Sequence, residues 1–383
     1  MDIFKILGFC LCALVLLSVL RQYNPGYAVL AALACCMVLL WFVMQALGPV
    51  LSFVETLSQF SGFEHLGTVF KAVAIALMAQ SVQDLCMEAG QTALAGRVEL
   101  AGKVAVKLHT GEQHGPNIIP RPWVQALLEK DLPGATIVET NTYYAGDRYT
   151  TADHRKTLEV NGWTFCPVDI LDEEGTVDLP VAGGKWFDHM SMGSHITKYD
   201  SLFVLTHFKG HAQGGFGGSC KNIGIGCADG RVGKAEIHTV PGSDNMWSIA
   251  QEELMERMTE SAKATVDHFG EHISFVNVLR NMSVSCDCEG VAAAPVVTPN
   301  IGILASRNIL AIDQASVDLV YALKEEDRHA LVERIETRHG LRQLTYMKEL
   351  GMGNDRYHLI DIDNNDVEIT AQDAAKDVVP FEG

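Results

Sequence analysis

The distribution of apolar residues divides the chain into two parts near residue 103. Three long apolar runs precede that point, at residues 3–20, 27–54 and 66–85. A helix needs roughly 20 mostly apolar residues to cross the hydrocarbon of a bilayer. The first two runs are of that length, whereas Lys71, Gln80 and Gln83 interrupt the third. The pattern therefore predicts amino-terminal transmembrane helices, two or three in number.

Beyond residue 103 the chain alternates short apolar runs with helix-length segments. Buried strands that alternate with helices pair in parallel and carry helices on both faces. We therefore predict an α/β fold, with transmembrane helices in residues 1–103 and a soluble domain with a mostly parallel sheet flanked by helices in residues 104–383. The predicted strands are 104–108, 135–139, 163–168, 201–206, 273–279 and 301–305, and the predicted helices are 122–130, 151–160, 246–269, 312–322 and 327–339.

Charge and cysteine content limit the partners and the compartment. The chain has 47 acidic and 29 basic side chains, a net charge of −18, which argues against a nucleic-acid partner, because such binding depends on neutralising phosphates. Arg21, Arg97 and Lys103 place the soluble domain in the cytoplasm if three runs span the membrane, by the positive-inside rule. Two spans would place it on the other side. In a reducing cytosol the ten cysteines would be thiols or metal ligands.

The loop that follows the predicted strand 201–206 carries the densest group of polar and flexible residues. Ligands of open α/β sheets bind beyond the carboxyl ends of strands. Glycines allow backbone amides to approach an anion closely, and lysines add positive charge. We therefore expect this loop to bind an anionic ligand, although a loop that only turns tightly is the alternative. The expected catalytic residues here are His207, Lys209 and His211, and the expected ligand-binding residues are Gly214, Gly215, Gly217, Gly218, Lys221, Asn222 and Lys234.

Four cysteines could add a metal site to this loop. Cys220 and Cys227 lie within it, and Cys286 and Cys288 lie in a later loop that could be its neighbour. Thiolates suit zinc or an iron–sulfur cluster. The alternative is that all four are ordinary buried thiols.

Three further places follow predicted strands. His109 and Glu112 come after the first strand and form a candidate proton-transferring pair. Arg148 follows the second strand and could pair with a carboxylate or phosphate. Asp313 opens a predicted helix, and the favoured interpretation is that it complements the helix dipole.

The first 103 residues resemble the stage III sporulation protein AC/AD family. The resemblance rests on the opening MDIFKILGFCL, on the Arg21-Gln22 pair before the second apolar run, and on the stretch LGTVFKAVAIALMAQSVQDLCMEAGQTALAGRVELAGK. It implies a multi-pass cell-membrane protein with other sporulation membrane proteins as partners, in a channel complex between mother cell and forespore. The chain departs from the family after Lys103, where a soluble strand replaces a further apolar helix.

The soluble part resembles the domain of unknown function 362 family, often described as iron–sulfur centre proteins, over about residues 104–360. The matching motifs include KVAVKLHTGE, NTYYAGDR, THFKGHAQGGFGGSCKNIGIGC and SVSCDCEG. Many members carry an inserted ferredoxin module with two C-x₂-C-x₂-C-x₃-C-P runs. This chain has no cysteine between Lys234 and Met246, so ferredoxin-type clusters are not expected.

These observations support two hypotheses. In the first, a membrane-tethered domain binds an anionic small molecule, or a metal ion or iron–sulfur centre, in the HFKGH loop, for redox or metal-cofactor chemistry. In the second, the chain is a non-enzymatic component of a sporulation membrane complex, and its soluble part is a docking module. The identity of the cofactor, and whether the chain is an enzyme, stay open at this point.

Overall fold

The computed structural model describes residues 102–381, apart from residues 241, 244 and 365. All of them lie in the second of the two units into which the chain divides, Glu99–Gly383. The runs predicted to cross a membrane lie outside the described residues. Within the described part, no helix has both the length and the apolar character needed to span a bilayer.

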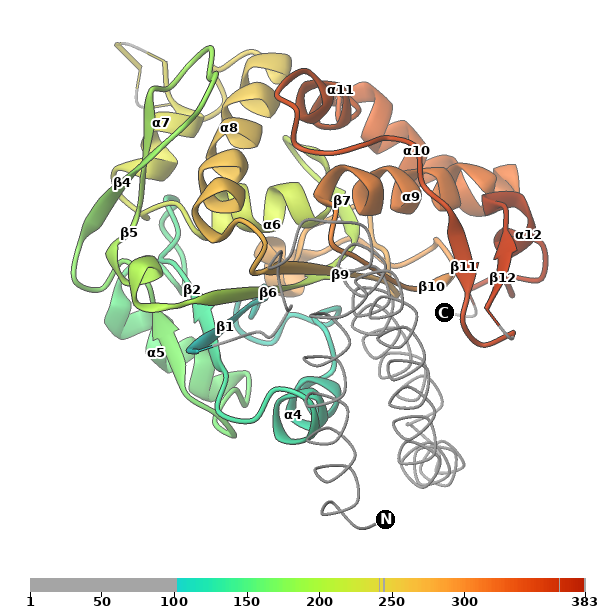
Figure 1. Ribbon diagram of the computed structural model, residues 1–383, viewed down its shortest axis with the longest axis horizontal. Coiled ribbons are helices and arrows are strands. Elements are labelled where there is room, and N and C mark those ends of the chain that lie inside the picture. Colours follow the sequence, from blue (N-terminus) through green and yellow to red (C-terminus); the bar gives the residue numbers. More distant parts are fainter. Residues whose placement is uncertain (1–101, 241, 244, 365, 382–383) are drawn as a thin grey trace, which may run out of the picture. The chain divides into compact units, whose positions relative to one another are not determined.

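A six-stranded sheet forms the centre of this unit, with the strands in the order β10-β9-β6-β1-β2-β3 (Figure 1). All neighbouring strands pair in parallel except β10, which is antiparallel to β9. The sheet therefore confirms the mostly parallel architecture. Its strands are β1 Val104–Lys107, β2 Thr136–Glu139, β3 Val168–Ile170, β6 Ser201–His207, β9 Ile273–Leu279 and β10 Gly302–Ser306.

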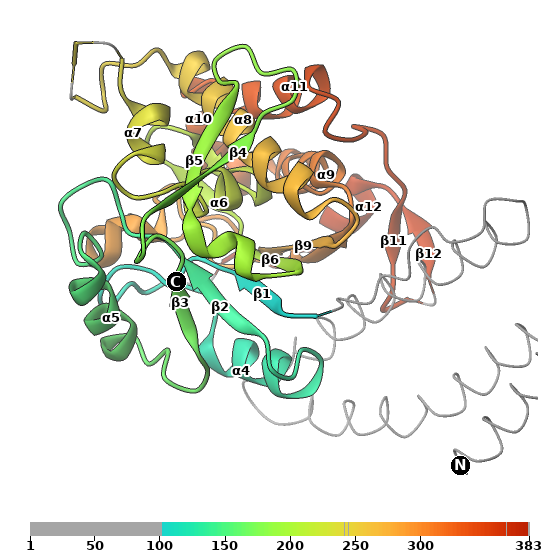
Figure 2. The same cartoon turned by 60° about the vertical axis from the view of Figure 1, so that its left-hand side comes forward.

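Helices cover both faces of the sheet. Helices α4 (Arg121–Lys130) and α5 (Thr151–Val160) lie on one face, and α6 (Ser219–Gly226), α8 (Gln251–Phe269) and α9 (Ile309–Ala322) lie on the other (Figures 1 and 2). The remaining helical segments are α7 Gly233–His238, α10 Glu325–Thr337, α11 Arg342–Glu349, α12 Ala371–Ala375 and the short 3₁₀ turns η1 Ser194–Lys198 and η2 Asp287–Ala292.

Three antiparallel hairpins complete the unit. Strands β4 (Thr176–Pro180) and β5 (His189–Gly193) form one of them, beside α7 and α8. Strands β11 (Leu359–Asp361) and β12 (Val367–Ile369) form another. The third pairs β7 (Lys209–His211) with β8 (Gly215–Gly217) and contains the HFKGH motif.

The long helix α8 shows how the apolar pattern becomes packing. Leu254, Met258 and Ala262 are buried in the core on one stripe of the helix, as their spacing of four predicts. Gly270 ends the helix with φ +54°, a conformation that costs glycine little. The helix begins at Gln251 rather than at the predicted Met246, because Met246 is held outside it by a hydrogen bond of 2.7 Å from Gln213 Nε2 to its carbonyl.

One predicted strand is misplaced. Residues 163–167 are irregular and β3 starts only at Val168, because the side chain of Trp163 faces the segment after β1. Its Nε1 donates a hydrogen bond of 2.9 Å to the carbonyl of Thr110. That indole bond anchors the loop that carries His109.

Candidate ligand-binding site

A cavity of about 470 Å³ lies beyond the carboxyl ends of the central strands. Strands β2 and β3 extend the sheet on one side of β1, and β6 and β9 extend it on the other. The order of the strands therefore reverses between β1 and β6, which is where open α/β sheets leave a crevice. Segments after β1, β2, β6 and β9 all contribute lining residues.

A buried ion network forms the floor of the cavity. Lys107 ends β1 and Glu139 ends β2, and Lys107 Nζ lies 2.8 Å from Glu139 Oε2. Arg148 lies 3.4 Å from the other oxygen of Glu139 and 2.9 Å from Glu112. Burial would raise the pKa of Glu139, but Lys107 and Arg148 hold it well below its usual range. The cations and the carboxylates in the floor of the cavity therefore neutralise one another.

Lys107 and Glu139 were not among the residues singled out from the sequence. Each is the single charged residue that ends a short buried apolar strand, VAVK or TIVE. A charge in such a position must be paired or must face a site. A single charged residue at the end of a short apolar strand is therefore the sequence pattern that could have identified Lys107 and Glu139.

Glu112 and His109 lie near each other in the chain but have different partners. The carboxylate of Glu112 accepts hydrogen bonds from Arg148 Nε at 2.9 Å and from the hydroxyl of Tyr144 at 2.5 Å. His109 lines the cavity, and its Nδ1 accepts a hydrogen bond of 3.0 Å from the amide of Gly111. The structure thus uses Glu112 to fix Arg148 and does not pair it with His109.

The HFKGH motif holds the segment between the two late cysteines. His207 Nδ1 lies 2.9 Å from Asp287 Oδ2, and Lys209 Nζ lies 2.9 Å from the same oxygen. His207 Nε2 lies 2.7 Å from the carbonyl of Arg280. Both ring nitrogens of His207 therefore face acceptor oxygens. Burial would raise the pKa of Asp287, but His207 and Lys209 lower it.

His207 and Lys209 therefore do not reach the cavity as the sequence analysis expected. Both are almost fully buried against Asp287, and neither is among the lining residues. The third residue of the motif, His211, does line the cavity. The motif thus positions the cysteine segment with two residues and presents only the third to a ligand.

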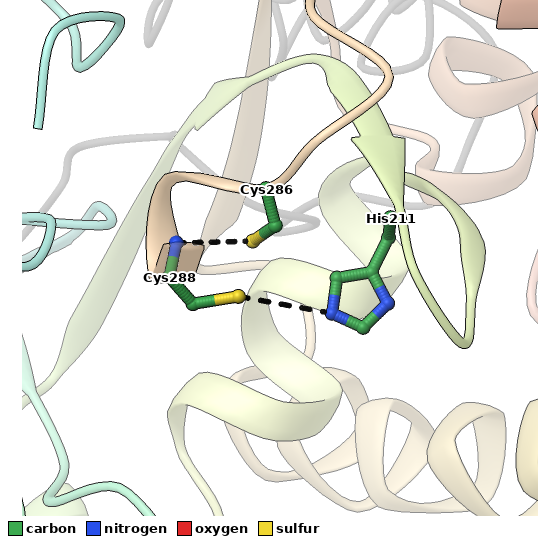
Figure 3. Close-up of side chains that lie close together, drawn as sticks. All are labelled: His211, Cys286 and Cys288. Carbon is green, nitrogen blue, oxygen red and sulfur yellow. Dashed lines mark hydrogen bonds between the residues drawn. The ribbon is translucent and has the colours of Figure 1, made fainter. Parts of the chain in front are cut away.

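His211, Cys286 and Cys288 form a compact group (Figure 3). One potential ligand atom from each lies within 4.8 Å of the others. His211 Nε2 is 4.0 Å from Cys288 Sγ, and the amide of Cys288 donates to Cys286 Sγ at 3.4 Å. A hydrogen bond from the Cys288 side chain and the positive charge of Lys221 lower the pKa of Cys286. The same hydrogen bond raises the pKa of Cys288.

The donor chemistry of this group fits a metal only in part. Two thiols and an imidazole suit a soft ion. However, His211 Nδ1 accepts amide hydrogen bonds from Gly214 at 2.8 Å and from Gln213 at 3.2 Å, so the ring proton of its neutral form sits on Nε2. A metal-bound imidazole normally has the reverse arrangement, with its second nitrogen donating. Within the described residues the group offers two thiols, whereas a cubane cluster uses four.

Cys220 and Cys227 do not join this group. Both are buried in the core, Cys220 in the first turn of α6 and Cys227 at its carboxyl end. Cys220 Sγ donates to Thr259 Oγ1 at 3.7 Å. Burial raises the pKa of Cys227 to about 11, and it also raises the pKa of Cys220. The structure therefore corrects the expectation that four thiols meet, because a helix turns these two toward α8.

The glycine-rich stretch is close-packed backbone and not an open nest for an anion. The amides of Ser219 and Cys220 donate to the carboxylate of Asp313 at 2.7 and 2.8 Å. Asp313 thus caps α6, whereas the sequence suggested that it complements its own helix. The four glycines expected to bind a ligand are buried in the hairpin and its exit and do not line the cavity: Gly214, Gly215, Gly217 and Gly218.

Two lysines face the cavity without a carboxylate. Lys221 lies on α6 and Lys234 on α7, and in residues 102–381, as far as they are described, neither forms an ion pair. Lys234 Nζ donates to Thr140 Oγ1 at 2.7 Å and to the carbonyl of Asn141. Burial lowers the pKa of Lys234 to about 8. Asn222, also expected at the site, accepts a hydrogen bond of 3.1 Å from Lys107.

Aromatic side chains also line the cavity, and none of them was among the site residues expected from the sequence. Tyr143 stacks on His238 with a centroid distance of 6.2 Å and an interplanar angle of 16°. His238 Nδ1 lies 2.8 Å from the carbonyl of Lys234, and burial lowers the pKa of His238 to about 4. Met246 and Trp247 border the mouth, and the Trp247 side chain is 64% exposed.

Comparisons with known proteins identify both parts of the chain. The family model described as "Domain of unknown function (DUF362)" matches residues 104–318, and the model of the stage III sporulation protein AC/AD family matches residues 3–57. Stage III sporulation protein AD of Bacillus subtilis strain 168 is 30% identical over 108 residues, which are 27% of this chain and 80% of that protein.

Two solved structures are similar at low identity. The lactate racemase apoprotein from Thermoanaerobacterium thermosaccharolyticum matches 59% of this chain with 14% identity and a TM-score of 0.36. A Thermotoga maritima protein matches 63% with 12% identity and a TM-score of 0.31. The matches span only 51% and 56% of those two chains.

Proposed function

The chain belongs over residues 104–318 to the domain of unknown function 362 family and in its amino-terminal part to the stage III sporulation protein AC/AD family, and from this premise we propose that its soluble part binds a small anionic ligand against Lys221 and Lys234. The observation that carries the proposal is that two ammonium groups in one cavity of an acidic protein have no ion-pair partner among the described residues. Lys234 is almost fully buried, and an ammonium group buried without an ion-pair partner is costly. A bound anion removes that cost.

Asp172 and Glu139 act on Lys234 only through space, and in the described residues no carboxylate forms an ion pair with Lys221 or Lys234. Lys107 and Arg148 already neutralise Glu139. The carboxylate of Glu289 accepts hydrogen bonds from the amide of Cys286 at 3.0 Å and from the hydroxyl of Ser285 at 2.7 Å. Lys221 and Lys234 are therefore the cations left for a ligand.

The apolar wall narrows the kind of anion. Tyr143, Tyr144, Ile225, Met246 and Trp247 all border the same space. Burial of apolar surface is worth about 25 cal/mol per Å². The ligand that fits best is therefore an organic anion with an apolar or aromatic part rather than a bare inorganic ion.

Calorimetric titration of the full chain in a non-ionic detergent tests the proposal. The probes are inorganic phosphate, an aliphatic dicarboxylate and an aromatic carboxylate. We expect the aromatic carboxylate to bind, and Lys221→Met to weaken that binding at least about tenfold, which is the loss of one charge-assisted contact. Lys198→Met, which removes a surface lysine paired with Glu174, is the matched control and should bind normally. Equal binding by both variants would rule out the site.

A soft metal ion held by His211, Cys286 and Cys288 is the second candidate. It is favoured by the three potential ligand atoms within 4.8 Å of one another and opposed by the amide hydrogen bonds to His211 Nδ1. Metal analysis of the anaerobically purified full chain separates the two possibilities. A stoichiometric amount of iron, zinc or nickel that Cys288→Ser abolishes would support it, and trace amounts would exclude it.

The family match of the amino-terminal part supports a location of this ligand-binding domain at a membrane. We propose that residues 1–103 associate with other sporulation membrane proteins and tether the soluble domain at the cell membrane, on its cytoplasmic side. The alternative function is a docking module without a ligand. Pull-down from sporulating cells distinguishes them, because the docking role requires that Lys221→Met leave every partner bound while deletion of the soluble domain releases one.

A further inference from the structure

We propose that Cys286 and Cys288 form a redox-active dithiol that exchanges with small disulfides entering through the cavity. Their two sulfurs are within 4.8 Å of each other, at the start of η2. The backbone amide of Cys288 donates to Cys286 Sγ at 3.4 Å, so the sulfur of Cys286 is the acceptor of the pair. The proposal does not depend on the anionic ligand inferred above.

The neighbouring imidazoles are oriented as hydrogen-bond donors to sulfur. His211 Nδ1 accepts from the amides of Gln213 and Gly214, and His109 Nδ1 accepts from the amide of Gly111. In each neutral ring the proton is therefore on Nε2. His211 Nε2 faces Cys288 Sγ at 4.0 Å (Figure 3). Such donors stabilise a thiolate, which is the reactive form of cysteine.

The segment is held rigidly enough to keep the two sulfurs together. Asp287, between the cysteines, is 4% exposed and is bound by both His207 and Lys209. Glu289 completes a capping box by accepting a hydrogen bond of 3.0 Å from the amide of Cys286. His207 and Lys209 are thus positioning residues for the dithiol.

Access differs between the two sulfurs and sets the order of reaction. Cys288 lines the cavity, whereas Cys286 is 1% exposed and does not. Cys288 is therefore the sulfur that meets an incoming disulfide, and Cys286 is the resolving sulfur behind it.

The exchange is balanced with a small disulfide, RSSR, as the oxidant. Cys288 Sγ passes its proton to the Cys286 thiolate and attacks one sulfur of RSSR, which breaks the S–S bond and releases RS⁻. Cys286 then loses that proton to RS⁻ and attacks Cys288 Sγ, which releases the second RS⁻. The two cysteines are oxidised to a disulfide, and RSSR is reduced to one thiol and one thiolate.

Mass spectrometry of the full chain after equilibration in glutathione redox buffers tests the proposal. With oxidised glutathione, the wild-type peptide that contains both cysteines should lose two hydrogens and carry no adduct. Cys286→Ser should retain glutathione on Cys288, because the resolving sulfur is gone. Cys288→Ser should leave Cys286 unmodified, because only Cys288 borders the cavity.

Cys166→Ser is the matched control, since this partly exposed thiol lies outside the group. It should not change the oxidation of the peptide. The proposal is overturned if the wild-type peptide keeps both hydrogens across the whole buffer series while Cys166 becomes modified. It is also overturned if Cys286 carries glutathione in the Cys288→Ser variant, because that result reverses the access of the two sulfurs. The wild-type measurement stands even if a variant fails to fold.

Discussion

Lys209 Nζ lies 2.9 Å from Oδ2 of Asp287, the residue between Cys286 and Cys288. Both side chains are almost fully buried, at 5% and 2% exposure. This ion pair connects the loop after β6 to the loop after β9. The HFKGH motif therefore acts largely through the cysteine segment that it positions.

Replacing Asp287 by Asn should destabilise the α/β domain strongly. It would leave Lys209 buried without a counter-charge, a situation that costs about 3–5 kcal/mol. Urea unfolding followed by tryptophan fluorescence measures the loss. Asp188→Asn, at an exposed position, is the control and should change the free energy of unfolding by less than about 0.5 kcal/mol.

The contribution of Asp287 to the free energy of unfolding should also depend on pH. Its pKa is lowered in the folded protein, so its contribution is fully present above the pKa of the unfolded chain, about 3.9, and is lost as the pH falls toward the folded value. The difference in unfolding free energy between wild type and Asp287→Asn should therefore be smaller at pH 3 than at pH 7. A constant difference would show that the carboxylate charge does not act as described.

Lys234→Met should stabilise the free protein at pH 7. The pKa of Lys234 is about 8 in the folded protein and about 10.4 when unfolded. The unfolded chain thus binds more protons between these values, and the wild type gains stability as the pH rises through that window. The variant should be more stable by about 1–2 kcal/mol at pH 7, and in urea unfolding experiments that advantage should shrink as the pH rises above about 8 and be lost only above about pH 10.4.

Anion affinity should fall as the pH rises through about 8, because Lys234 loses its proton there. Calorimetry with the aromatic carboxylate at pH 6.5 and pH 9.5 measures the change. We expect wild-type affinity to drop about tenfold or more, since the anion loses one cationic partner. Lys234→Met should bind the anion weakly at both pH values. If that variant kept the pH dependence, a group other than Lys234 would be the one that titrates.

Gly210→Ala should disrupt the packing of the β7–β8 hairpin against the cysteine segment. A Cβ at Gly210 would lie 2.4 Å from the carbonyl oxygen of Val284, which is backbone and cannot rotate away. We expect the free energy of unfolding to fall by about 1–3 kcal/mol. Gly217→Ala on the partner strand is the control, because the nearest atom would be 3.6 Å away. Equal urea midpoints for the two variants would contradict this account of the packing.

The location of the site could be predicted from the sequence, because the carboxyl ends of parallel strands meet at one edge. His109, Arg148, His211 and Cys288 all follow strands that the apolar pattern identified, and all four line the cavity. Which residues face a ligand could not be predicted. His207 and Lys209 turn to Asp287, which lies about eighty residues further along the chain, and no local pattern encodes that contact.

The helix α6 was missed because its composition disfavours it. Gly224 and Gly226 weaken a helix interior by about 1 kcal/mol each. Two tertiary contacts compensate: Asp313 caps the first turn, and Gly224 allows α8 to approach, since a Cβ there would lie 2.4 Å from the carbonyl oxygen of Met258. The helix carries Lys221 and Asn222 to the cavity and turns Cys220 into the core.

A crystal structure of the full chain soaked in an iodinated aromatic carboxylate, with an anomalous difference map, tests the central claim most directly. The iodine atom marks the position of the anion. Our account predicts a strong peak inside the cavity, with the carboxylate within hydrogen-bonding distance of the Nζ atom of Lys221 or Lys234, and no such peak in Lys221→Met/Lys234→Met. Peaks confined to the outer surface, with none in the cavity of the wild type, would contradict it.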